Sequence, residues 1–286
     1  MTRFAAVLGH PISHSKSPAM HRAAYRELGV DIDYSAVDVT EEGLPALMRR
    51  ISAETGWTGL SVTMPLKTAM IAEVHEVRGV GRALGVVNTV AFEGHGPDAR
   101  RIAYNTDVEG IVSALRHAGL ETPGHAVILG GGATSAAAVA ALGSLGALTV
   151  QVFVRDTGRA ADARAAGVAL GLAVEVRPIS EAAASIPAAD VVISTLPPRA
   201  ADGLAAELAE AGRPTPGVLL DVAYDPWPSV IADAWSRGGG AVVPGLEMLL
   251  YQAVEQVRLF TGRGADVNAA VIDVMCDAVG LPRRAN

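Results

Sequence analysis

The chain has 286 residues, half of them hydrophobic and only 4% aromatic, and a formal net charge of −7. This length fits one or two domains whose cores are built from Ala, Val, Leu and Ile. The acidic balance, without a long run of either sign, argues against a nucleic-acid partner or an anionic-membrane surface. No stretch approaches the roughly 20 apolar residues of a membrane span.

Two residue types are scarce. Cys276 is the only cysteine, and we predict that it is a core residue of a helix in a protein of a reducing, cytoplasmic compartment; we expect no signal peptide at the N-terminus. The chain has 21 arginines but only two lysines, Lys16 and Lys67. A lysine kept in such a chain is expected where a proton must be released, which arginine does not do. The alternative is an ordinary surface lysine.

The first hundred residues alternate between strand and helix patterns. Residues 4–9, 32–39 and 57–63 read as strands. The first helix should start at Ser17 as N-cap with Pro18 at its first position, and end before Gly29. Further helices are expected over 41–51 and from Pro65 to about 74. Residues 86–92 and 101–104 predict a hairpin with its turn at 93–99. The alternation indicates a mostly parallel sheet covered by helices.

The second part of the chain has a different pattern of strands and helices. An amphipathic helix is predicted over 107–119, and residues 121–124 break the pattern. Strands over 126–129, 148–154, 191–194 and 218–222, with helices between them, indicate a doubly wound, Rossmann-like nucleotide-binding domain. The chain closes with helices over about 246–261 and 266–279, which we expect to pack on the first domain.

A glycine turn follows the strand at 126–129. Gly130, Gly131 and Gly132 open a helix, so that backbone N–H groups and the positive helix end can face a pyrophosphate. The next three residues are small enough for phosphates to approach: Ala133, Thr134 and Ser135. The alternative is a tight turn in an α/β fold.

The end of the next predicted strand bears on the choice of cofactor. NAD enzymes carry an acidic residue there for the ribose 2′-OH, whereas this chain has Arg155 and then Arg159. Two guanidinium groups suit a 2′-phosphate and favour NADP. Asp156 leaves NAD open, and the arginines could also be a solvated helix start.

The loop before the first helix and the segment after the third strand carry candidate site residues. Ser15 and Ser17 can hold a carboxylate with their hydroxyl groups at a helix N-terminus, although Ser17 is also an N-cap candidate. Lys67 is expected in the first turn of a helix, which disfavours an ammonium ion and helps a group that must give and take a proton. A solvated lysine is the alternative.

Three more polar residues stand out. Asn88 lies in an otherwise apolar strand pattern and is costly to bury without partners, which a polar ligand could supply. Asp107 begins a helix, where an acidic residue is ordinary stabilisation. Gln252 lies at the edge of the apolar stripe of its helix, where it can reach a cleft or face solvent.

Six motifs, in order, resemble those of the shikimate dehydrogenase family over nearly the whole chain. They are His14–Pro18 (His-Ser-x-Ser-Pro), Ser61–Lys67 (Ser-Val-Thr-x-Pro-x-Lys), Val87–Thr89, Asn105–Asp107 (Asn-Thr-Asp), Asp221–Pro226 and Gly245–Gln252. The resemblance implies two α/β domains flanking a cleft. The substrate and catalytic domain would comprise residues 1–105 and 245–286, and the NADP domain residues 106–244.

The resemblance also implies roles. Ser15 and Ser17 would hold the substrate carboxylate, with Tyr224 nearby, and ring hydroxyls would be bound by Thr63, Asn88, Asp107 and Gln252. Lys67, paired with Asp107, would be the acid/base group. NADP would be bound by residues 130–135, Arg155, Arg159, Thr195 and Gly245. The implied reaction is the reversible, NADPH-dependent reduction of 3-dehydroshikimate to shikimate, on the route to chorismate and aromatic amino acids, by a monomer or homodimer without a metal.

The sequence departs from the family pattern at a few places. Val154 replaces a frequent Asn, Ser194-Thr195 stand where Asn-Ala-Thr is usual, and Glu247 fills a place often held by Gly. These differences bear on cofactor preference and on the surroundings of Tyr224. Two alternatives therefore stay open: a relative acting on quinate or an aminated shikimate, and an NADP-binding regulatory module without turnover.

Overall fold

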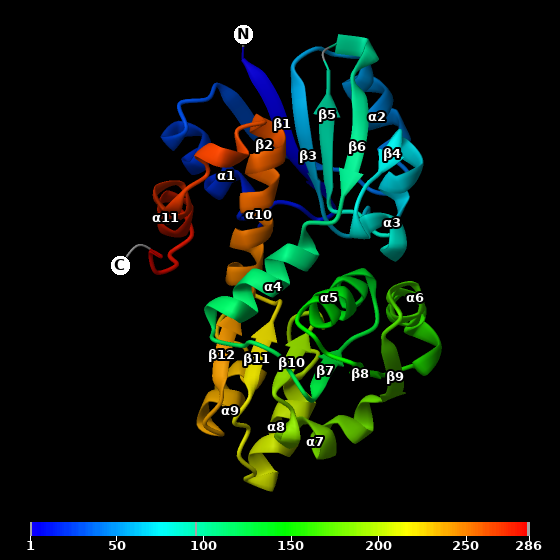
Figure 1. Cartoon of the computed structure of the whole chain (residues 1–286), viewed down its shortest axis with the longest axis vertical. Coiled ribbons are helices and arrows are strands. Elements are labelled where there is room, and N and C mark those ends of the chain that lie inside the picture. Colours follow the sequence, from blue (N-terminus) through cyan, green and yellow to red (C-terminus); the bar gives the residue numbers. More distant parts are fainter. Residues whose placement is uncertain (1, 95, 285–286) are drawn as a thin grey trace. The chain divides into compact units, whose positions relative to one another are not determined.

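A computed structural model describes residues 2–94 and 96–284 and shows two units, each built around a six-stranded sheet (Figure 1). One unit comprises residues 1–106 together with 249–286, and the other residues 107–248. The α/β class and the doubly wound pattern predicted from the sequence are confirmed. In the described residues, no helix is both long and apolar enough to cross a membrane.

The sheet of the first unit has the strand order β2-β1-β3-β5-β6-β4. Its strands are β1 (Arg3–Gly9), β2 (Ile32–Asp38), β3 (Trp57–Val62), β4 (Glu76–Val77), β5 (Thr89–Glu93) and β6 (Arg100–Tyr104). β1 pairs in parallel with β2 and β3, whereas β5 is antiparallel to β3 and β6. The predicted hairpin is thus confirmed, although its first strand begins at Thr89 instead of Val86. Residue 95, in its predicted turn, lies outside the described residues.

Helices cover this sheet. They are α1 (Ser17–Glu27), α2 (Leu44–Ala53), the short α3 (Val80–Leu84), α11 (Ala269–Asp277) and α10 (Gly245–Thr261), which joins this unit from Leu249 on. Leu44, Met48 and Ile51 of α2 pack with Leu8 and Leu60 of the sheet into one buried cluster. Helix α1 contacts α11, where Cys276 is fully buried as predicted.

Three local predictions in this unit are wrong. Ser17 is the first helical residue, not the N-cap: Lys16 holds the N-cap position with helical dihedrals, and its side chain makes no capping hydrogen bond. Helix α2 begins at Leu44 instead of Glu41. No α-helix follows Pro65: residues 64–68 form turns and a 3-10 helix covers Ala69–Glu73. The Lys67 carbonyl accepts a hydrogen bond from Val87 N (3.0 Å), which removes it from any helical ladder.

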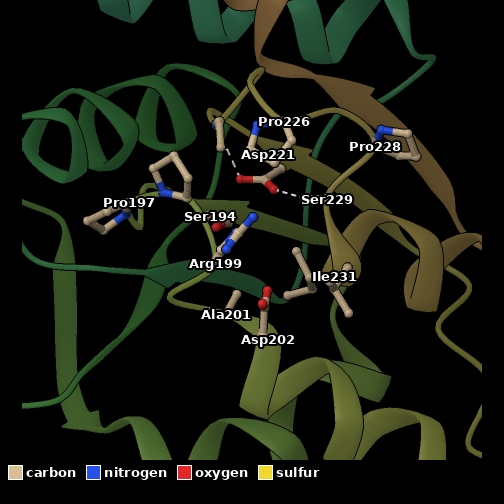
Figure 2. A pocket seen from close by; sticks show the side chains of 13 residues that line it. Ser194, Pro197, Arg199, Ala201, Asp202, Asp221, Pro226, Pro228, Ser229 and Ile231 are labelled. Atoms are coloured by element: carbon tan, nitrogen blue, oxygen red, sulfur yellow. Dashed lines mark hydrogen bonds between the residues drawn. The ribbon is translucent and has the colours of Figure 1, made fainter.

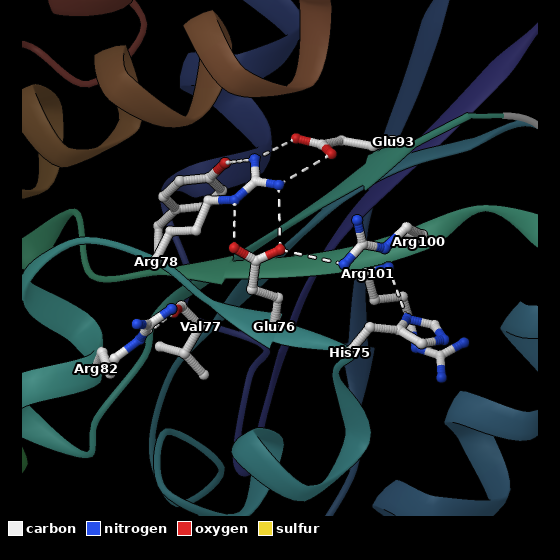
Figure 3. Close-up of polar contacts among 9 residues, drawn as sticks. His75, Glu76, Val77, Arg78, Arg82, Glu93, Arg100 and Arg101 are labelled. Atoms are coloured by element: carbon white, nitrogen blue, oxygen red, sulfur yellow. Dashed lines mark hydrogen bonds and ion pairs between the residues drawn. The ribbon is translucent and has the colours of Figure 1, made fainter.

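Ion pairs surround the short edge strand β4 (Figure 3). The Arg78 guanidinium donates to Glu76 Oε1 (2.8 Å) and Glu93 Oε1 (2.5 Å), and Arg100 also reaches Glu76 (3.2 Å). The hydrogen bond from Arg78, followed by the nearby charges of Arg78 and Arg100, lowers the pKa of Glu76. Exposed pairs of this kind add little stability, but charges on a short edge strand discourage pairing with another chain.

The sheet of the second unit is entirely parallel, in the order β12-β11-β10-β7-β8-β9. The strands are β7 (Ala126–Leu129), β8 (Thr149–Val154), β9 (Ala173–Pro178), β10 (Val191–Ser194), β11 (Val218–Asp221) and β12 (Ala241–Pro244). The helices are α4 (Asp107–His117), α5 (Ala133–Ser144), α6 (Ala161–Leu170), α7 (Ala182–Ser185), α8 (Asp202–Ala211) and α9 (Val230–Arg237).

The chain leaves β7 in one direction through β8 and β9 and returns on the other side through β10, β11 and β12. The strand order therefore reverses between β7 and β10. In such sheets, ligands bind outside the carboxyl ends of the strands at this switch point. The glycine turn 130–132 follows β7 directly, so it lies at that place.

Candidate active site

The loop after β1 is held in place by Asp38, the last residue of β2. The Asp38 carboxylate accepts from His10 Nδ1 (2.7 Å) and from Ile12 N (3.1 Å), and the His10 hydrogen bond is the main cause of a lowered pKa of Asp38. Further along, Ser17 N donates to Ser15 Oγ (3.3 Å). The two hydroxyl-bearing residues thus meet at the start of α1, with Ser15 partly exposed and Ser17 buried.

The segment that carries Thr63 and Lys67 lies beside this loop. Thr63 N donates to Leu8 O (2.9 Å), and His10 N donates to Met64 O (3.0 Å). The bond from Val87 N to Lys67 O ties the same segment to the residue before Asn88. Lys67 is partly exposed. Since it lies in a turn and not in the first turn of an α-helix, the electrostatic argument from the helix dipole does not apply to it.

Asn88 is buried and finds its partners inside the protein. Its Oδ1 accepts from Thr106 N (2.7 Å) and from Thr89 Oγ1 (2.9 Å), and its Nδ2 donates to Gln252 Oε1 (3.3 Å). Gln252 is 5% exposed, so it is not a surface residue. Protein groups as well as a ligand can therefore satisfy Asn88. Asp107, buried at the start of α4, follows Thr106 directly.

The three glycines after β7 differ in what surrounds them. A Cβ on Gly130, whose φ is +111°, would lie 2.4 Å from Thr195 Oγ1, and one on Gly131 would lie 3.0 Å from Arg159 O. A Cβ on Gly132 would meet nothing within 4 Å. Only at Gly132 does the missing side chain leave space beside the N-terminus of α5. A phosphate can approach the backbone there.

Side chains around this turn hold it in place. Ser135 Oγ and Thr195 Oγ1 are 2.7 Å apart, and Thr195 Oγ1 donates to Leu129 O (3.0 Å). Thr195, which follows β10, thereby links the two strands at the switch point. The predicted residues from Gly130 to Ser135 and Thr195 thus lie together.

Arg155 and Arg159 follow β8 and are exposed. Asp156 Oδ1 accepts from Gly158 N (2.9 Å) and caps the 3-10 turn Thr157–Arg159. Within residues 2–94 and 96–284, neither guanidinium takes part in an ion pair. Two exposed arginines beside the glycine turn fit a dinucleotide that carries an extra phosphate.

The ends of β10 and β11 border a cavity of about 310 Å³ (Figure 2). Asp221 lies in it and accepts from Ser229 Oγ (2.6 Å) and Ala223 N (3.3 Å), while burial raises the pKa of its carboxyl group. Burial likewise raises the pKa of Tyr224, three residues on. Apart from the Asp221–Pro226 motif, nothing in the sequence pointed to this cavity, because its lining comes from two separate strand–helix loops.

Gly245 begins α10 at the end of β12. A Cβ there would lie 2.2 Å from Val222 O, so the helix start packs directly on the segment before Tyr224. In the described part of the chain, no group of three His, Cys, Asp or Glu side chains is arranged to hold a metal ion.

Comparison with known proteins agrees with this geometry. Residues 7–90 match the shikimate dehydrogenase substrate binding domain, and residues 245–270 the shikimate 5′-dehydrogenase C-terminal domain. The chain is 39% identical, over 94% of both chains, to the shikimate dehydrogenase (NADP(+)) of Rubrobacter xylanophilus.

Solved structures extend the likeness to the fold. The Mycobacterium tuberculosis shikimate dehydrogenase is 37% identical with a TM-score of 0.82, covering 97% of this chain and 99% of that one. The Thermus thermophilus shikimate 5-dehydrogenase, solved in complex with NADP(H) and shikimate, is 29% identical with a TM-score of 0.79, covering 98% and 100%. The chain belongs to the shikimate dehydrogenase family.

Proposed function

We propose that this protein is an NADP-dependent shikimate dehydrogenase, an oxidoreductase that reversibly reduces 3-dehydroshikimate to shikimate on the route to chorismate and the aromatic amino acids. The observation that carries the proposal is that Ser15, Ser17, Lys67, Asn88 and Gln252 all lie in one unit of a chain that matches a shikimate dehydrogenase over 94% of its length. The first unit would bind the substrate and the second the cofactor.

The substrate is a small ring with one carboxylate and several hydroxyl groups. Ser15 and Ser17 supply hydroxyl donors at the N-terminus of α1, where a carboxylate is favoured; Tyr224 stays a prediction as a further ligand. Asn88 and Gln252 form an amide pair (3.3 Å) whose donors and acceptors suit ring hydroxyls. Thr63 lies on the segment between the two groups.

The chemistry requires one proton and one hydride. NADPH, when bound, supplies the hydride to the ketone carbon. The resulting alkoxide needs a proton, which Lys67 delivers in the reduction and takes back in the reverse reaction. The pairing of Asp107 with Lys67 stays a prediction. No metal is called on, since the lysine provides the proton and the charge at the reacting oxygen.

The cofactor preference follows from Arg155 and Arg159, which can bind a 2′-phosphate through charge-assisted hydrogen bonds. Gly132 leaves room for the pyrophosphate, and Thr195 holds the backbone of the glycine turn; Gly245 stays a prediction as a cofactor contact. The cytoplasmic location and the monomeric or homodimeric state stay predictions from the sequence.

A spectrophotometric assay tests the proposal. Shikimate and quinate are each offered with NADP⁺ and with NAD⁺, and the appearance of reduced nicotinamide is followed. We expect the highest kcat/KM for shikimate with NADP⁺. A higher kcat/KM with quinate or with NAD⁺ would reassign the substrate or the cofactor. If no pair is turned over, the alternative of an NADP-binding regulatory module is favoured.

A further inference from the structure

Gln256 lies on α10 one turn beyond Gln252, and no motif assigned it a role. It is 1% exposed, and its amide makes three hydrogen bonds. Nε2 donates to the main-chain oxygen of Asn88 (3.3 Å) and to Thr89 Oγ1 (3.0 Å), and Oε1 accepts from Ser61 Oγ (2.6 Å). A helix near the C-terminus is thereby joined to the ends of β3 and β5.

The direction of these hydrogen bonds is fixed by chemistry. The Asn88 carbonyl only accepts, so the NH₂ group of Gln256 must face it and the Gln256 oxygen must face Ser61. Ser61 therefore donates its hydrogen to Gln256, and its oxygen accepts from Tyr34 OH (2.7 Å). One polarised chain runs from Tyr34 through Ser61 to Gln256.

At the Tyr34 end, this chain reaches Ser17, where the loop that carries Ser15 meets α1. The Tyr34 ring is fully buried and stacked on His21, with the ring centroids 4.0 Å apart. Burial raises the pKa of Tyr34, while its hydrogen bonds with Ser61 and Ser17 oppose that rise. The contact between Tyr34 and Ser17 joins this chain to the first residue of α1.

At the other end, the chain reaches Asn88 by two routes. Gln256 holds the Asn88 main chain directly, and Thr89 Oγ1 accepts from Gln256 while it donates to Asn88 Oδ1 (2.9 Å). Since Oδ1 also faces Thr106 N, which only donates, the Asn88 amide can present only its NH₂ to Gln252. Each member of the network has a single orientation.

We propose that Gln256 is a positioning residue for the substrate, which holds Asn88 in the orientation that binds a ring hydroxyl without touching the substrate itself. The inference rests on the proposed function, because it assumes that Asn88 binds shikimate. Buried polar groups that are fully hydrogen-bonded specify one arrangement of their neighbours. Removing Gln256 should therefore release Asn88 more than it disturbs the cofactor unit.

The test begins with Gln256→Met, which keeps the length of the side chain and removes all three hydrogen bonds. We expect the KM for shikimate to rise about tenfold, since a net hydrogen bond is typically worth about a factor of ten, with the KM for NADP⁺ unchanged. Gln151→Met is the matched control: Gln151, in the other unit, also hydrogen-bonds side chains, among them Ser185 Oγ (2.5 Å). It should leave the shikimate KM unchanged.

A double-mutant cycle separates positioning from mere stability. If Gln256 acts through Asn88, then Gln256→Met adds little to the KM of an Asn88→Ala variant, whereas independent effects would multiply. Should Gln256→Met not fold, Thr89→Val carries the test, because it removes the hydroxyl between Gln256 and Asn88. Thr89→Ser, which keeps that hydroxyl, should restore the wild-type KM.

The outcomes distinguish the two claims. Two results would overturn the positioning role and leave the proposed function standing, provided that the wild type turns over shikimate. In the first, Gln256→Met and Thr89→Val have the wild-type KM for shikimate. In the second, the effects of Gln256→Met and Asn88→Ala on that KM multiply. If the wild type itself does not turn over shikimate, both fall. Coupled effects confined to the shikimate KM support the positioning role.

Discussion

Gly132→Ala separates cofactor binding from folding. Gly132 has a φ of −90°, which alanine adopts freely, and its Cβ would meet no atom within 4 Å. A glycine replaced by alanine at an unstrained site stabilises a protein by about 0.4–1 kcal/mol, because the unfolded chain loses freedom. The free enzyme should therefore keep or slightly raise its melting temperature.

The same methyl group would enter the space proposed for the pyrophosphate. Displacing the phosphate from one backbone N–H removes a hydrogen bond to a charged group, worth about 1.5–3 kcal/mol. Since about 1.4 kcal/mol corresponds to a factor of ten, the Kd for NADP⁺ should rise about 10- to 100-fold. Shikimate binding should not change.

Gly131→Ala is the control with the opposite pattern. Its Cβ would lie 2.9 Å from Val154 Cγ1 and 3.0 Å from Arg159 O, and overpacking of this kind typically costs about 1–3 kcal/mol of folding stability. Urea unfolding and calorimetric titration with NADP⁺ measure both quantities for both variants. A Gly132→Ala protein that binds NADP⁺ as tightly as the wild type would refute the placement of the pyrophosphate.

Four further predictions concern the other site residues and the core. Arg155→Ala should raise the KM for NADP⁺ about 10- to 100-fold and leave that for NAD⁺ nearly unchanged; equal losses would reject a 2′-phosphate contact. Ser15→Ala should weaken shikimate binding with little change in melting temperature, since Ser15 Oγ accepts only one long hydrogen bond, from Ser17 N (3.3 Å), and a normal KM would exclude this loop as the carboxylate site. Lys67→Ala should lower kcat about 10²–10⁴-fold, and Lys67→Arg should stay slow because guanidinium keeps its proton; a near-normal kcat for Lys67→Arg would make Lys67 a fixed charge only. Burial lowers the pKa of His21 from 6.5 to about 4, so the unfolded chain is protonated first and stability falls as the pH drops from 6.5 towards 4. At about 1.4 kcal/mol per pKa unit, the loss in the free energy of unfolding is about 3 kcal/mol. Urea unfolding at pH 7 and pH 4.5 measures this loss, and His21→Phe should remove most of the difference between the two pH values. An unchanged difference would assign the loss to other groups.

The sequence by itself determined the elements whose signals are local. Strands β7 and β10 have the predicted bounds, Ala126–Leu129 and Val191–Ser194, because a parallel strand buried on both faces is a continuous apolar run. Helix α4 begins at Asp107 as expected, and the glycine turn follows β7. The motifs also named the residues that the first unit brings together, since each motif lies at a strand end or a helix start.

Only the tertiary structure decided features that depend on partners far away in the chain. Lys67 lies in a turn, where its carbonyl oxygen accepts a hydrogen bond from Val87 N. Ser17 is inside the helix because Lys16 already has helical dihedrals. Gln256 showed no sequence signal, since its partners Ser61 and Asn88 are 195 and 168 residues away. Hydrogen bonds between distant segments leave no periodic pattern in a sequence. For that reason the strands and motifs could be predicted from the chain, whereas the network that orients Asn88 appears only once β3, β5 and α10 are packed together.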